Sequence, residues 1–148
     1  MKNYLVVLIL SFTFACGSKP EHTNTDIDSK DTISDWARPG AQKQMSGAYF
    51  IYKNPLNVAD TLLSVESNAS MMAQIHESYT TDDGLASMRE MKQIIIAPNE
   101  TLVLQRGGTH LMLMELKKDL ANGDSINVQL TFTQAGKIDL SLPVLSSN

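Results

Sequence analysis

Four side chains in the middle of this sequence could bind a soft metal ion: His76, Met88, His110 and Met112. Eleven residues separate the first histidine from the first methionine, 21 separate that methionine from the second histidine, and one separates the last pair. The last pair lies in residues 109–114, which have the character of a strand, so alternate side chains share a face. His110 and Met112 would then project side by side, roughly 6.5–7 Å apart along the backbone. This spacing allows both to contact one ion.

The donor types indicate which ion that would be. A thioether is soft and uncharged, so it suits Cu(I) and is a poor ligand for Zn²⁺, Mg²⁺ or Ca²⁺. Two imidazoles and two thioethers carry no net charge, which favours a monovalent ion, whereas zinc sites more often contain thiolates or carboxylates. We therefore expect copper(I) as the bound metal, and no catalytic residues or enzymatic activity.

Packing is the alternative explanation for these residues. Methionine is a flexible core filler, and a Met-rich run with leucines between commonly packs inside a sheet. A histidine on an apolar strand is also often a core residue with satisfied hydrogen bonds. Met71 and Met72 are further sulfur candidates, for which packing is the expected role. Trp36 is expected to anchor the core, with shielding of a metal as the alternative.

The first residues have the features of an export signal. Residues 1–15 contain one lysine and then an apolar run that is too short to span a bilayer. Cys16, the only cysteine of the chain, follows a small alanine, which predicts a lipid-carrying N-terminus after cleavage. An ordinary cleavage site beside an incidental cysteine is the alternative. Lipidation would place the protein on the periplasmic side of a membrane without any free thiol, and thiols oxidise there.

Composition limits the partners. Residues 16–32 are polar and contain one large aliphatic side chain, so we expect a flexible linker after the lipidated cysteine. His22 lies in it, either as a solvated residue or as a helper in copper capture. The net charge of −4 and the lack of a basic cluster argue against nucleic acid and against electrostatic membrane binding. Six per cent aromatic residues are too few for an aromatic ligand platform.

The remainder, residues 33–148, is expected to form one all-β domain. Runs of β-favouring residues between turn signals predict strands at residues 45–52, 61–66, 71–77, 93–97, 101–105, 109–114, 125–133 and 137–144. Residues 78–87 read as a polar loop with Asp83-Gly84 as its turn, in which Asp82 and Asp83 are solvated. Short strands without a sustained helical period predict a Greek-key β-sandwich or barrel.

Short motifs are spread over residues 33–144: Trp36-Ala37-Arg38-Pro39, Ala48-Tyr49-Phe50, His76-Glu77, Asp83-Gly84, Met88-Arg89, Gly107-Gly108-x-His110-x-Met112-Leu113-Met114-x-Leu116-Lys117, Leu120-x-x-Gly123-Asp124, Leu130-Thr131-Phe132 and Gly136. In these motifs the chain resembles the periplasmic Cu(A) chaperone family, called PCuAC, whose domains are cupredoxin-like. The resemblance implies four Cu(I) ligands in the order His76, Met88, His110, Met112. The family usually has ten residues where this chain has eleven between the first two ligands, so Met91 is the alternative to Met88.

The resemblance also implies a function. It predicts a chaperone that binds Cu(I) outside the cytoplasm and passes it to the dinuclear copper centre of cytochrome c oxidase, directly or through a thioredoxin-like assembly factor. Two alternatives remain open at this point. One is a copper-buffering lipoprotein without a dedicated recipient, and the other is a structural lipoprotein whose methionines only pack.

Overall fold

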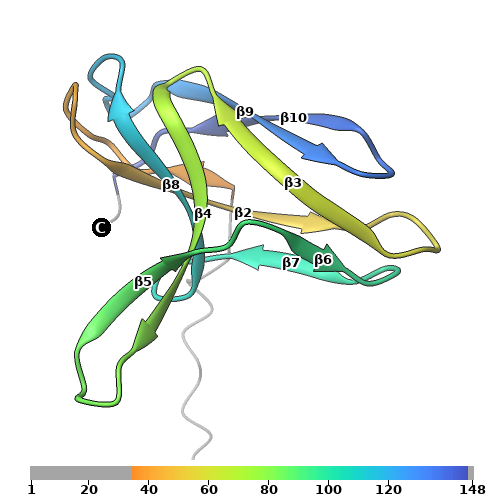
Figure 1. Ribbon diagram of the computed structural model, residues 1–148. Helices are drawn as coiled ribbons and strands as arrows, with labels where there is room; N and C mark the ends of the chain where they lie inside the picture. Colours follow the sequence, from red (N-terminus) through yellow and green to blue (C-terminus); the bar gives the residue numbers. More distant parts are fainter. Residues whose placement is uncertain (1–34, 147–148) are drawn as a thin grey trace, which may run out of the picture. The chain divides into compact units, whose positions relative to one another are not determined.

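Ten β-strands make up the regular structure of residues 35–146, the part of the chain that the computed structural model describes (Figure 1). In chain order they are β1 (Trp36–Ala37), β2 (Ser46–Lys53), β3 (Asp60–Ser67), β4 (Ser70–Thr80), β5 (Ala86–Glu90), β6 (Ile94–Ile96), β7 (Thr101–Leu104), β8 (Thr109–Leu116), β9 (Ser125–Phe132) and β10 (Lys137–Pro143). Within this range there is no helix that could cross a membrane. The predicted signal peptide, Cys16 and the linker lie outside the described residues.

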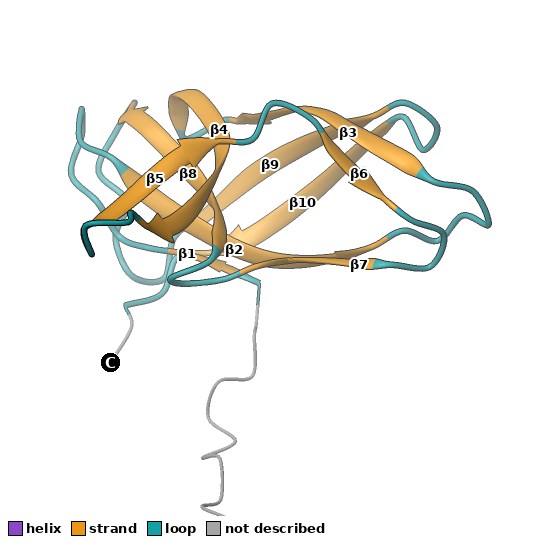
Figure 2. Ribbon diagram, turned by 60° about the horizontal axis from the view of Figure 1, so that its bottom comes forward, coloured by secondary structure: helices purple, strands orange, loops and turns teal. Residues whose placement is uncertain are grey.

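The strands form two antiparallel sheets (Figure 2). One sheet has the order β1-β2-β8-β4-β5, with β7 also pairing with β2, and the other has the order β10-β9-β3-β6. The chain changes from one sheet to the other at five connections, of which the one from β3 to β4 is the shortest. The prediction of an all-β sandwich is confirmed.

The core fills the space between the sheets with alternate side chains of the strands other than β5, which has no buried residue. In β9, Ile126, Val128 and Leu130 are buried while the residues between them are more exposed. In β8, Leu111 and Leu113 are fully buried, and they belong to the same core cluster. Because strand side chains alternate, burying these leucines leaves the other face of β8 outside the core. The candidate site occupies that outer face.

A buried carboxylate ties the start of β3 to the turn after β9. Asp60 is 1% exposed, and it accepts hydrogen bonds from Oγ1 of Thr133 (2.7 Å) and from the backbone N–H groups of Thr61, Gln134 and Ala135 (2.7–2.9 Å). Desolvation alone raises the pKa of Asp60, but these hydrogen bonds outweigh it and lower the pKa below its ordinary value. The ionised carboxylate therefore stabilises this end of the sandwich.

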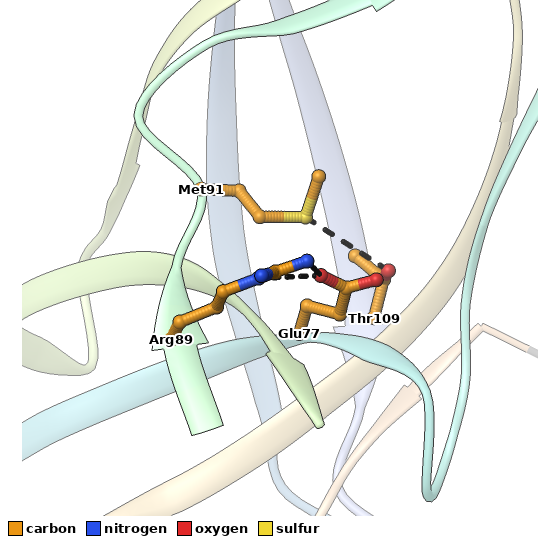
Figure 3. Close-up of polar contacts among 4 residues, drawn as sticks. All are labelled: Glu77, Arg89, Met91 and Thr109. Atoms are coloured by element: carbon orange, nitrogen blue, oxygen red, sulfur yellow. Dashed lines mark hydrogen bonds and ion pairs between the residues drawn. The ribbon is translucent and has the colours of Figure 1, made fainter. Parts of the chain in front are cut away.

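Two predictions from the sequence are wrong. Residues 78–87 are not a loop, because β4 and β5 pair from His76↔Glu90 to Thr80↔Ala86, and only the tip is a turn. A cross-strand ion pair between Glu77 and Arg89 (2.6 Å) lies in this hairpin (Figure 3). The hairpin extends past the core, so its residues lack the apolar alternation that predicts a strand.

The second wrong prediction concerns Trp36, which was expected to anchor the core. Its side chain is half-buried and is not part of the core.

Candidate metal centre

The two histidines that the sequence singled out lie directly opposite each other. His76 of β4 pairs with His110 of β8 in the antiparallel ladder, so both side chains project from the outer face of the sheet. Their ring centroids are 6.2 Å apart, and the ring planes are inclined by 67°. His110 is 8% exposed, whereas His76 is more accessible. Thirty-three residues of sequence separate two imidazoles that the sheet makes neighbours.

The β7–β8 turn fixes the hydrogen-bonding state of His110. Its Nδ1 atom lies 2.9 Å from the carbonyl oxygen of Gly108. A carbonyl can only accept, so Nδ1 carries the proton, and in the neutral imidazole Nε2 is the nitrogen with the free lone pair. Gly107, at φ 72°, supplies the left-handed conformation that brings this carbonyl back to the ring. A backbone carbonyl holding the far nitrogen of an imidazole is the usual support of a metal-binding histidine.

His76 has a different partner. Its Nε2 atom lies 3.2 Å from Oε1 of Gln74, two residues earlier on the same face. With Nε2 donating to this amide oxygen, Nδ1 is the nitrogen that has a lone pair for a metal. Gln74 also pairs with Met112 in the ladder, so its amide lies between the His76 ring and the Met112 thioether.

Met112 lies next to His110 along the outer face of β8. Its neighbour on β2 is Gly47, which contributes no side chain to cover it. A Cβ at Gly47 would come within 3.3 Å of the Tyr49 hydroxyl oxygen, so there is little room for a larger residue. Met112 is therefore only half-buried and remains available as a sulfur donor.

Met88 approaches the histidines from β5. It pairs with Ser78 of β4, on the face that carries His76, and its side chain is 53% exposed. A hollow of about 450 Å³ lies over this region and is lined by Arg38, Tyr49, Ser78, Met88, Arg106, Gly107 and His110. The ladder places Met88 and Met112 on opposite sides of the histidine pair. The structure thus brings the two imidazoles together with one thioether on each flank, and the two thioethers are not adjacent.

Met91, the alternative sulfur, lies on the other side of the sheet. It packs against the core, and its backbone N–H donates to the carbonyl of Ile75. Its Sδ atom accepts a long hydrogen bond from Oγ1 of Thr109 at 4.0 Å (Figure 3). Since Thr109 alternates with His110 along β8, this contact is on the inner face. Of the two candidates, only Met88 shares a face with the histidines.

Aromatic and cationic side chains border the hollow. Of these, sequence reasoning named only Trp36, with shielding of a metal as its alternative role, and did not assign Arg38, Tyr49 or Arg106 to the site. The guanidinium of Arg106 lies 4.8 Å from the ring centroid of Trp36, and that ring lies 4.8 Å from Tyr49. The neighbouring Arg38, also a lining residue, adds a second positive charge. Arg38 lies inside the Trp36–Pro39 motif, and Arg106 directly precedes Gly107-Gly108. Their place in or beside these motifs was the sequence signal that could have pointed to them. Two cations disfavour a multiply charged metal more than a monovalent one.

Carboxylates do not offer an alternative ligand set. Within residues 35–146 no three His, Cys, Asp or Glu side chains lie close enough together to hold a metal ion. Glu90 pairs with His76 in the ladder, but it is exposed and has no second carboxylate to complete a group. The side chains that lie beside the two histidines on this face and could act as soft donors are the thioethers of Met88 and Met112.

Comparison with known proteins gives the family and the fold. The LpqE-like lipoprotein family matches residues 31–144. A relative from Leifsonia xyli subsp. xyli (strain CTCB07) that is named as a lipoprotein, Lxx21020, is 33% identical over 144 residues, which cover 95% of this chain and 86% of the relative.

Two solved structures have the same architecture. The copper-bound PCuAC domain from PmoF2 matches with a TM-score of 0.60 and 20% identity, over 76% of this chain and 89% of that domain. The solution structure of CuI-DR1885 from Deinococcus radiodurans matches with a TM-score of 0.58 and 23% identity, over 83% of this chain and 84% of that protein. The expectation of a cupredoxin-like PCuAC fold is confirmed. The chain belongs to the LpqE-like lipoprotein family and has the fold of PCuAC domains.

Proposed function

We propose that this protein is a lipid-anchored, extracytoplasmic Cu(I) chaperone that holds copper with His76, His110, Met88 and Met112. The observation that carries the proposal is the pairing of His76 with His110 on an accessible face, with the Nε2 lone pair of His110 free. A thioether flanks each side of this pair, and no carboxylate group competes for the ion in the described residues. Neutral nitrogen and sulfur donors beside two arginines suit a soft monovalent ion.

The comparisons support the same proposal. Two of the matching structures are described as copper-bound or CuI-loaded, and the family and the curated relative are described as lipoproteins. Cys16 would carry the lipid after removal of residues 1–15, and the anchor would hold the domain on the periplasmic side.

Transfer would proceed by stepwise exchange of ligands. Met88 is the most exposed of the four donors, whereas His110 is nearly buried. An incoming thiolate or imidazole would therefore displace Met88 first and His110 last. Thioethers need no proton to leave, which keeps the barrier to exchange low. The proposed recipient is the CuA centre of cytochrome c oxidase, reached directly or through a thioredoxin-like assembly factor.

Competition for Cu(I) against a chromophoric chelator tests the binding. We expect the protein to withdraw copper from the chelator, and we expect His110→Ala to weaken affinity at least about hundredfold, equivalent to about 2.7 kcal/mol. The matched control is His22→Ala, the same change at the third histidine of the chain. Unchanged affinity in His110→Ala would contradict the proposed site.

Delivery needs a separate experiment. We expect that cells lacking the protein lose cytochrome c oxidase activity at low copper and regain it when copper is added. Normal oxidase activity together with raised copper sensitivity would instead indicate a buffering lipoprotein without a dedicated recipient.

A further inference from the structure

A second group of sulfur atoms lies on the same outer face, beyond the histidines. Met72 of β4 and Met114 of β8 are direct partners in the antiparallel ladder. Both continue the alternation that places His76 and His110 on this face, since each is four residues away from the histidine of its own strand. Direct partners on one face have Cβ atoms about 4.5–5.5 Å apart. Two long thioether side chains therefore start next to each other.

Met45 brings a third sulfur to this pair from the other side of β8, because β8 lies between β2 and β4 in the sheet and Met45 precedes β2. Ser46 pairs with Leu113, and on the other side of Met45 the N–H of Leu116 donates to the carbonyl of Gln44 at 3.0 Å. These contacts hold the backbone of Met45 beside Met114. Ser46 pairs with Leu113, whose side chain is in the core, so the alternation of β2 points to the outer face at Met45, the exposed residue that precedes the strand.

The three methionines are not packing residues. Met45 is 62% exposed and Met72 is 53% exposed, while Met114 between them is half-buried. The expectation that Met71 and Met72 are packing residues is therefore wrong, because both side chains are exposed to solvent. Exposed thioethers are flexible and can turn toward a common ion without repacking the core.

This methionine trio is separate from the histidine pair. Four strand residues from His110 to Met114 correspond to about 13–14 Å, which is too far for one ion to bind both. Met112 lies midway along the same face of β8. No titratable side chain takes part in the trio, so its donors keep their affinity without deprotonation.

We propose that Met45, Met72 and Met114 form a second, thioether-only site for a soft monovalent cation, Cu(I) or Ag(I). Three neutral sulfur donors, from β4, from β8 and from the residue just before β2, match the ligand preference of such an ion and of few others in biology. This site does not depend on the proposed function of the histidine pair. With Met112 between them, the two sites would form one continuous line of donors along β8.

The test uses Ag(I), which is not oxidised in air, and methyl-¹³C-labelled methionine in the His76→Ala/His110→Ala protein. We expect the methyl signals of Met45, Met72 and Met114 to shift together and to stop shifting at one silver ion per chain. The signal of Met91, on the inner face, should not move. No shift, or equal shifts of every exposed methionine including Met71, would overturn the proposal.

Sulfur removal in the otherwise unchanged protein separates the two sites. Met72→Leu/Met114→Leu keeps the apolar bulk and should lower total Ag(I) binding by one ion per chain, while the signals of His76 and His110 still respond. The matched control is Met71→Leu, an exposed neighbour that should bind as the unchanged protein does. If the unchanged protein shows the methionine shifts but no response of His76 and His110, the chaperone site is refuted and this second site stands. Unchanged binding in the double variant would refute the second site alone.

Discussion

The two faces of strand β8 have the same backbone and opposite roles. On the inner face, Leu111 and Leu113 are fully buried in the core between the sheets. On the outer face, His110, Met112 and Met114 alternate with them and face the candidate site or the solvent. Strand β4 repeats the division, with Ile75 buried next to His76. Stability therefore depends on one set of residues, and the proposed metal donors belong to another.

This division explains how exposed, flexible side chains on the outer face can be kept close to one another. The leucines fix the position of β8 between β2 and β4, and that position fixes which outer residues become neighbours. Changes on one face should have little effect on the property supplied by the other. Adjacent residues of β8 provide the sharpest test of this independence.

The largest effect is expected on the inner face. Leu113→Ala should lower the free energy of unfolding by about 2–5 kcal/mol, because it leaves a cavity in a fully buried position. Chemical denaturation measures this change. The folded fraction should still bind Cu(I) as tightly as the unchanged protein, and a parallel loss of affinity would mean that the faces are coupled.

A somewhat smaller effect is expected at the buried carboxylate, remote from the donors. Asp60→Asn should cost about 1.5–3 kcal/mol of stability at neutral pH, since charge-assisted hydrogen bonds are lost. The pKa of Asp60 is lower in the folded protein than in the unfolded chain, so its contribution is complete above the unfolded pKa of about 3.9 and is lost as the pH falls through the folded value. The free energies of unfolding of the two proteins should thus converge in acid. If their difference stays constant down to low pH, the ionised carboxylate is ruled out as its source.

The smallest effect is expected from an outer thioether. Met112→Ala, one residue from Leu113, should weaken Cu(I) binding about tenfold, equivalent to about 1.4 kcal/mol, by removing one of several donors. Its stability should change by less than about 1 kcal/mol, because the side chain is only half-buried. Calorimetric unfolding measures the change in stability, and chelator competition on the same samples measures the change in Cu(I) affinity. A stability loss as large as that of Leu113→Ala would show that Met112 is a packing residue.

Sequence reasoning went furthest where side chains alternate. The apolar residues of β8 and β9 predicted strands, and the alternation placed His110 and Met112 on one face. Sequence patterns could not show that His76 lies opposite His110, because residues 34 positions apart become partners only through the register of β4 on β8. The resemblance to PCuAC domains supplied that link.

The features that were missed have a common cause. The β4–β5 hairpin extends beyond the core, so it carries no apolar periodicity to predict it. The stacking of Arg106 on Trp36 and the row of Met45, Met114 and Met72 each combine residues from different strands or turns. Such combinations depend on strand order and register, which local sequence patterns do not contain.

X-ray absorption at the copper edge of the Cu(I)-loaded protein tests the central claim most directly. If His76 and His110 bind the ion together with thioethers, the first shell must contain both nitrogen and sulfur neighbours, and the nitrogen component must weaken in His110→Ala. A first shell without nitrogen, or one made only of nitrogen and oxygen, would contradict the proposed centre.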